Sequence, residues 1–227
     1  MALFLTDLDD TLIDREAAFA AWAESLVDSQ RLPAGSLECL LDHDFGHGTM
    51  TFEGFFGWVV SQYQVPFTRD QLLARFLEDI VTHFAPIDRE TVDAMKRLQA
   101  AGWKIAIVTN GSTRLQLRKL EVTGVIPFVD GWCISEEAYV RKPDPAIFRL
   151  AAERCGTTLA GGWMVGDSPD ADIAGGRAAG LQTAWIRRGR EWNRDDFVPD
   201  LVIDRVAEAV SVILHCQVTG GWERRPE

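Results

Sequence analysis

The chain has 227 residues, of which 47% are hydrophobic and 25% charged, a composition typical of a soluble globular protein and not of a disordered one. Its formal charge of −11 argues against nucleic acid or an anionic membrane surface as the main partner, because both attract clustered lysine and arginine. No apolar run approaches the ~18 residues of a membrane helix, and the first residues lack the basic segment of a signal peptide. We therefore expect a cytoplasmic protein, built as one large domain or as one domain plus an insert.

The first element in chain order is a short apolar run at 2–6, which predicts a buried strand that ends in acidic residues. Four stretches with helical periodicity then follow without an intervening strand: 16–30, 34–43, 52–64 and 69–84. Thr68 and Gln71 have the spacing of a capping box at the start of the fourth. We interpret residues 15–87 as an all-helical cap domain inserted into the rest of the fold.

From residue 88 onward, predicted strands alternate with predicted helices. The strands are 104–109, 131–135, 163–166, 182–186 and 201–203, and the helices are 88–102, 112–123, 144–155, 170–179 and 204–216. This alternation predicts an α/β fold, in which helices flank a Rossmann-like parallel sheet core. We assign 1–14 and 88–216 to this core and expect 217–227 to be a loose, polar C-terminal tail.

Three polar clusters directly follow predicted strands, and a fourth lies between a predicted strand and the helix after it. All four are expected at the carboxyl ends of the strands, where parallel sheets bind ligands. They are Asp7-Leu8-Asp9-Asp10-Thr11-Leu12, Thr109-Asn110-Gly111, Arg141-Lys142-Pro143-Asp144 and Gly166-Asp167-Ser168-Pro169-Asp170-Ala171-Asp172. Hard oxygen ligands without nearby histidine or cysteine suit Mg²⁺, and a lysine with a hydroxyl beside such a site suits a phosphoryl group. Since no serine or cysteine has an activating base nearby in the pattern, the indicated nucleophile is a carboxylate.

In this order, the four clusters resemble the four motifs of the haloacid dehalogenase (HAD) superfamily, and the helical block resembles that superfamily's cap. The resemblance spans residues 3–215, with one departure at Asp10, where glycine is often found. It implies a Mg²⁺-dependent phosphatase that hydrolyses a small phosphomonoester through an aspartyl-phosphate intermediate. A sugar phosphate, a nucleoside monophosphate or a small phosphorylated acid would be the substrate, and the enzyme would be a monomer or a small homo-oligomer.

The resemblance also assigns roles to the matching positions. Asp7 would be the nucleophile. Asp9 would protonate the leaving oxygen and then deprotonate the water that hydrolyses the intermediate. Thr109 and Asn110 would bind the phosphoryl oxygens, and Lys142 would neutralise charge between the phosphoryl group and Asp7.

Three positions are implied to hold the metal: the carboxylate of Asp7, the main-chain carbonyl of Asp9 and the carboxylate of Asp167. Thr11 and Asp172 would support this site, with Asp172 acting through water or through the lysine of the third motif.

The sequence of the cap identifies functional residues less clearly than the four motifs do. Residues 15–90 contain five arginines, no lysine and twelve acidic residues, a formal charge of −7, together with eleven of the 22 aromatic residues. We expect most of these aromatics to form the cap's own core. Arg15, at the entry to the cap, is the cation expected to face the site. The segment Asp42-His43-Asp44-Phe45-Gly46-His47-Gly48 breaks the helical periodicity, which makes it a candidate specificity loop with His43 and His47 as candidate residues.

Three alternatives remain open on the same fold. A phosphomutase shares every core motif and differs in the cap. A 2-haloacid dehalogenase would use Asp7 on carbon, but Asp9 argues against it because those enzymes lack an acid at that position. A non-catalytic regulatory protein is the third alternative, and the intact motifs argue against it.

Overall fold

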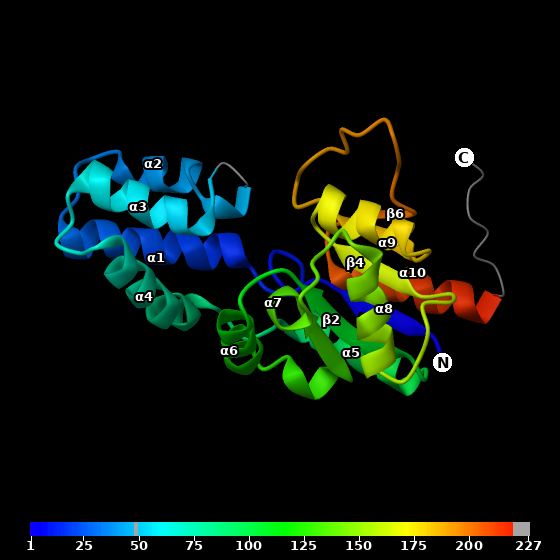
Figure 1. Ribbon diagram of the computed structural model, residues 1–227. Coiled ribbons are helices and arrows are strands. Elements are labelled where there is room, and N and C mark those ends of the chain that lie inside the picture. Colours follow the sequence, from blue (N-terminus) through cyan, green and yellow to red (C-terminus); the bar gives the residue numbers. More distant parts are fainter. Residues whose placement is uncertain (48–49, 220–227) are drawn as a thin grey trace. The chain divides into compact units, whose positions relative to one another are not determined.

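The computed structural model describes residues 1–47 and 50–219 and divides into two compact units (Figure 1). The sheet unit consists of Met1–Ile13 and the chain from Pro86 onward, and the helical unit is Asp14–Ala85. Residues 220–227, the greater part of the expected C-terminal tail, lie outside the described residues.

Six parallel strands form the sheet, in the order β3-β2-β1-β4-β5-β6. The strands are β1 (Leu3–Thr6), β2 (Lys104–Thr109), β3 (Gly131–Ile134), β4 (Trp163–Gly166), β5 (Gln182–Ile186) and β6 (Leu201–Ile203). This topology confirms the predicted parallel α/β core with a helical insertion after its first strand. Because the strand order reverses between β1 and β4, ligands are expected in the crevice beyond the carboxyl ends of these two strands.

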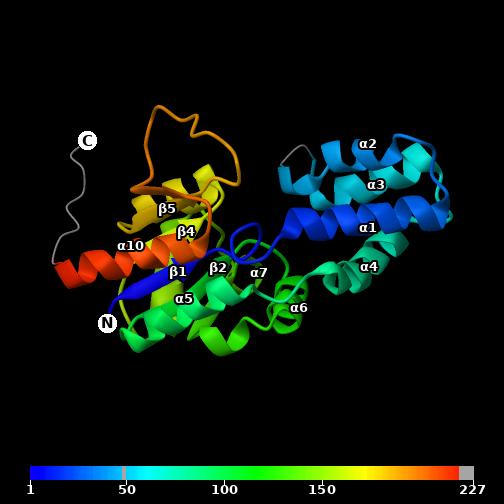
Figure 2. The same cartoon turned by 180° about the vertical axis from the view of Figure 1, so that it is seen from behind.

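Helices cover both faces of the sheet (Figures 1 and 2). On one face α5 (Arg89–Ala100) packs beside α10 (Val206–Thr219), and on the other α8 (Pro145–Arg154) lies beside α9 (Gly175–Ala178). All residues of β1 and β4 are buried, as expected for strands that are covered on two sides. Two further helices follow β2 and β3: α6 (Thr113–Thr123) and α7 (Ser135–Ala138).

The last predicted helix and the helix expected at 170–179 differ from the structure. The last helix continues to Thr219 and so includes the first residues of the expected loose tail. There the Trp103 indole N–H donates a hydrogen bond to Gln217 Oε1 at 2.8 Å, which ties this end of the helix to the sheet unit. The helix expected at 170–179 is a π-helical stretch, η4 (Pro169–Ala174), that leads directly into α9.

The helical unit contains α1 (Arg15–Gln30), α2 (Ser36–Asp42), α3 (Phe52–Tyr63) and α4 (Arg69–Asp79), with short 3₁₀ turns η1 (Phe45–His47) and η2 (Ile80–His83). The predicted capping box of α4 is present, because Gln71 N donates to Thr68 Oγ1 and Thr68 N donates to Gln71 Oε1. In the described part of the chain, no helix is both long and apolar enough to cross a membrane.

A cluster of aromatic rings forms the core of the helical unit. Trp22 and Phe76 pack edge to face with ring centroids 4.8 Å apart, and Phe55 and Phe56 pack in the same way at 5.3 Å. Phe55 and Phe56 are fully buried. The structure therefore agrees with the expectation that most aromatics of the insert form its own core.

Candidate active site

The third-motif lysine joins the first and fourth motifs. Asp7 directly follows β1, and its Oδ1 lies 2.7 Å from Lys142 Nζ. The same ammonium lies 2.6 Å from Asp172 Oδ1. All three residues are buried, with 7%, 3% and 0% of their surfaces exposed in the order Asp7, Lys142 and Asp172. Charges buried to this degree are stable only when they are paired, so the three side chains form one electrostatic unit.

A cluster of carboxylates lies at the same edge. One oxygen from each of Asp7, Asp167 and Asp172 lies within 4.8 Å of the other two. Such a set of hard oxygen donors fits a hard divalent cation such as Mg²⁺. Two members of the cluster, Asp7 and Asp167, belong to the metal-ligand set expected from the sequence, and the third carboxylate is that of Asp172.

The crowding and burial of these carboxylates raise the pKa values of Asp7 and Asp167. Burial raises the pKa of Asp7 well above its usual value, and the negative charges of Asp172 and Asp167 oppose the effect of Lys142. For Asp167, burial and the charges of Asp172 and Asp10 raise the pKa to about 7. Burial alone would lower the pKa of Lys142, but Asp172 and Asp7 hold it above its ordinary value, so the lysine stays protonated.

Asp172 reaches the site because β4 ends in glycine. A Cβ atom on Gly166 would lie 2.2 Å from Asp172 Oδ2, so a side chain at this position would displace the carboxylate. That oxygen also accepts a hydrogen bond from Ser168 N at 2.9 Å. The glycine in the fourth motif thus serves a packing function that makes the Lys142 pair possible.

The second motif contributes Thr109 and Asn110, which the structure uses in different ways. Asn110 donates from Nδ2 to Lys142 O at 3.0 Å and accepts from Lys142 N at 2.9 Å, so it holds the lysine's backbone. Thr109 Oγ1 accepts a hydrogen bond from Gln116 Nε2 at 2.6 Å. Because it accepts this bond, the threonine hydroxyl keeps its own hydrogen to donate elsewhere.

Two residues of α6 that the sequence analysis did not single out contact Asp9. Lys119 Nζ lies 2.8 Å from both carboxylate oxygens, and Gln116 Nε2 donates to Asp9 Oδ2 at 3.0 Å. The Asp9 side chain is 19% exposed, which leaves part of the carboxylate accessible. The one available signal in the sequence was composition, because the chain contains only four lysines.

Asp167 is held by a second group of residues that sequence reasoning missed. Arg190 Nη2 donates to Asp167 O at 2.8 Å and to Asp167 Oδ2 at 3.1 Å, and the Trp185 indole N–H donates to Asp167 O at 2.8 Å. Thr11 was expected to support the metal site. Its Oγ1 is buried and has no hydrogen-bond partner among the described residues.

The candidate residues of the insert have partners within the helical unit. Arg15 makes a two-pronged ion pair with Asp44, at 3.0 and 2.5 Å. His43 stacks on Trp58 with ring centroids 4.2 Å apart, and its Nδ1 lies 2.8 Å from Cys39 O. The side chain of His47 lies outside the described part of the structure, as does Gly48 of the candidate specificity loop.

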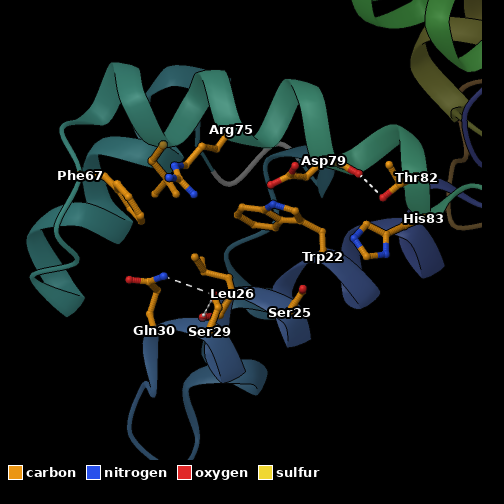
Figure 3. Close-up of a pocket in the computed structure, with 11 residues that line it drawn as sticks. Trp22, Ser25, Leu26, Ser29, Gln30, Phe67, Arg75, Asp79, Thr82 and His83 are labelled. Atoms are coloured by element: carbon orange, nitrogen blue, oxygen red, sulfur yellow. Dashed lines mark hydrogen bonds between the residues drawn. The ribbon is translucent and has the colours of Figure 1, made fainter.

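A cavity of about 360 Å³ opens in the helical unit between α1 and the segment formed by α4 and η2 (Figure 3). Trp22 and Leu26 contribute apolar lining, and Arg75, Asp79 and His83 contribute polar side chains (Figure 3). None of the residues from the four sequence motifs lines this cavity. The chemistry indicated by the motifs therefore belongs to the sheet edge.

The buried charge network leads to a stability prediction. Replacing Lys142 with methionine leaves Asp7 and Asp172 buried without their shared counter-ion, which should lower the free energy of unfolding by about 3–5 kcal/mol at neutral pH. Denaturant titration without divalent cations measures this loss. The matched control is Lys104→Met, which breaks the partly exposed pair with Asp130 and should cost about 0–1 kcal/mol. Equal losses in the two variants would contradict the account of the network.

Comparison with known proteins places this site in a family. A model of haloacid dehalogenase-like hydrolases matches residues 1–180. A glyceraldehyde 3-phosphate phosphatase from Methanopyrus kandleri is 39% identical over 128 residues, which are 55% of each chain. A ribulose-1,5-bisphosphate 5-phosphatase from Halopiger xanaduensis is 34% identical over 139 residues, 61% of this chain and 56% of the relative. These matches span about half the length of the curated relatives.

Solved structures give the likeness over the whole fold. The magnesium-bound crystal structure of the HAD-hydrolase YfnB from Bacillus subtilis is 26% identical, has a TM-score of 0.76, and is matched over 93% of this chain and 98% of that one. The match includes the six-stranded parallel sheet and the helical insertion that follows its first strand. The motifs, the topology and the family match agree, and the chain belongs to the haloacid dehalogenase-like hydrolase family.

Proposed function

We propose that the protein is a Mg²⁺-dependent phosphatase that hydrolyses a small phosphomonoester through a phosphorylated aspartate. The observation that carries this proposal is the convergence at Asp7. Its carboxylate lies 2.7 Å from a buried ammonium and within 4.8 Å of two further carboxylates. A nucleophile, a phosphate-neutralising cation and a set of metal ligands thus meet at one strand end.

In the first step, an Asp7 carboxylate oxygen forms a bond to phosphorus as the bond from phosphorus to the leaving oxygen breaks. Asp9 gives its proton to that oxygen, so the alcohol leaves neutral. In the second step, Asp9 removes a proton from a water molecule whose oxygen attacks phosphorus. Inorganic phosphate leaves, and the carboxylate of Asp7 is regenerated.

The remaining residues neutralise the charge of the phosphoryl group or hold the side chains that contact it. Lys142 neutralises a phosphoryl oxygen beside Asp7, and the Thr109 hydroxyl donates to another. Asp172 fixes the lysine through the contact at 2.6 Å. Asp7, Asp167 and the main-chain carbonyl of Asp9 would hold Mg²⁺, which supplies charge neutralisation for the phosphoryl group and its nucleophile when bound. The clustered carboxylates and their raised pKa values fit such an ion.

The raised pKa values predict how Mg²⁺ affinity depends on pH. Asp167, with a pKa of about 7, is protonated below that pH and must lose its proton to bind the metal. The dissociation constant for Mg²⁺ should therefore rise as the pH falls below 7, by about tenfold per pH unit for each proton displaced. Asp7 also has a raised pKa and adds to this dependence. Calorimetric titration between pH 5.5 and 8.5, without substrate, measures this dependence. A constant affinity across this range would contradict the role given to Asp167.

Phosphate release tests the function directly. Purified protein should release inorganic phosphate from a simple phosphomonoester with Mg²⁺, and EDTA should abolish the release until Mg²⁺ is restored. A regulatory protein would release none. Halide release from a 2-haloacid would indicate the dehalogenase alternative, and conversion of one sugar phosphate isomer to another would indicate the phosphomutase.

The charge of the insert bears on the substrate. Residues 15–90 carry a formal charge of −7, and the arginine at the start of the insert is paired with Asp44. A second phosphate on the substrate would add negative charge near a protein that is already acidic, and unit charges near a protein surface repel by about 4 kcal/mol at 4 Å. We infer a substrate with one phosphate and little other negative charge, such as a sugar monophosphate or a nucleoside monophosphate.

This inference predicts an order of preference. Values of kcat/KM should fall from the mono- to the di- to the triphosphate of one nucleoside, and from a sugar monophosphate to its bisphosphate. The relative named as a ribulose-1,5-bisphosphate 5-phosphatase makes the second comparison a demanding one. A preference for the more highly charged member of either set would show that the charge of the insert does not decide specificity.

A further inference from the structure

Two buried side chains of α6 hold the carboxylate of Asp9 from one side. Lys119 Nζ lies 2.8 Å from both oxygens, and Gln116 Nε2 donates to Oδ2 at 3.0 Å. We propose that Lys119 and Gln116 are positioning residues, which orient Asp9 for its proton transfers to the leaving oxygen and from water. This inference rests on the proposed function, because it concerns the group given the acid–base role there.

The burial of Lys119 is the first support for this role. The residue is 4% exposed, and removing an ammonium from water is costly unless a carboxylate pairs with it. Contact with both oxygens restricts the rotation of the Asp9 carboxylate as well as its displacement. A group that transfers a proton must lie within hydrogen-bond reach of the reacting oxygen, and a displacement of about 1 Å can cost about 10²-fold in rate.

Gln116 provides the second support, because it connects Asp9 to the second motif. Its Nε2 also donates to Thr109 Oγ1 at 2.6 Å, and the glutamine is 1% exposed. One amide group therefore fixes the separation between the acid–base carboxylate and the hydroxyl proposed to bind phosphate. Gly111 leaves room for this arrangement, since a Cβ atom there would lie 3.1 Å from the Gln116 side chain and the backbone has φ +153°.

A positioning role through Asp9 has a specific kinetic signature. An alkyl leaving group departs as an alkoxide unless it receives a proton, whereas a p-nitrophenolate group leaves readily without one. Lys119→Met should therefore lower kcat/KM for an alkyl phosphomonoester by about 10²-fold, and for p-nitrophenyl phosphate by much less. The ratio kcat/KM is the suitable quantity because it does not include the later hydrolysis of the aspartyl-phosphate.

A double-mutant cycle separates this role from direct contact with the substrate. In the Asp9→Asn background, Lys119→Met should cause no further loss with the alkyl substrate, because Lys119 acts through Asp9. Lys119→Arg keeps the charge and the donors and should retain more alkyl activity than the methionine variant. The matched control is Lys104→Met, which breaks an ion pair at the start of β2 and should leave both activities unchanged. Thermal unfolding of each variant establishes that it is folded.

Three results would overturn the inference, and the first two concern variants that lose activity. One is an equal loss with the alkyl and aryl substrates in folded Lys119→Met, and another is a full additional loss in the Asp9→Asn background. The variants are compared with wild-type enzyme that releases phosphate. Wild-type enzyme that releases no phosphate with Mg²⁺ would instead refute the proposed function. If Lys119→Met behaves like Lys104→Met while Asp9→Asn is impaired, the phosphatase assignment stands and the role of Lys119 is wrong.

Discussion

Replacing Asp7 with asparagine should reduce phosphomonoester turnover by at least ~10³-fold, the loss that follows when a catalytic unit of this kind is broken. The carboxamide keeps the shape of the side chain but loses its charge, its nucleophilicity and its ability to bind a metal ion as a carboxylate. The fold should persist, because Lys142 retains its contact with Asp172 at 2.6 Å.

Steady-state assays and thermal unfolding of the same preparation test this expectation. Asp93→Asn is a suitable control, since it removes a carboxylate from an exposed pair with Arg89 on α5 and should leave turnover unchanged. Near-normal turnover in folded Asp7→Asn would contradict the assignment of Asp7 as the nucleophile.

Asp9→Asn should slow both formation and hydrolysis of the aspartyl-phosphate, each by about 10²–10⁴-fold, the usual contribution of a positioned acid or base. Asparagine neither gives a proton to the leaving oxygen nor takes one from water. Because both steps slow, rapid-quench kinetics should show no fast initial release of the alcohol. A normal burst followed by slow phosphate release would restrict Asp9 to the second step.

The main features of the sheet edge could be predicted from the sequence because they depend on local rules. Apolar runs that end in acidic residues identify strands whose side chains leave at the carboxyl end, and parallel topology brings those ends together. In this way the sequence predicts the parallel sheet core and the helical insert. It also points to the edge where Asp7, Lys142 and Asp172 meet.

The contacts around Asp9 and Asp167 could not be predicted in the same way. Lys119 is 110 positions away from Asp9 in the sequence, and its helical periodicity does not reveal which side chain it will contact. Arg190 reaches Asp167 from the loop after β5, which has no regular pattern. The partner of Arg15 was equally hidden, because its pair with Asp44 depends on how α1 and the turn after α2 pack together.

Mass spectrometry of acid-quenched enzyme detects the aspartyl-phosphate itself. The protein is mixed with excess phosphomonoester and Mg²⁺, quenched in acid within the first turnovers, digested and sequenced by tandem mass spectrometry. We predict one phosphoryl group on the peptide that contains Asp7, assigned to that residue. The group should be absent when EDTA is added first and absent in Asp7→Asn. Rapid phosphate release without any labelled peptide, or a label on another residue, would contradict the account.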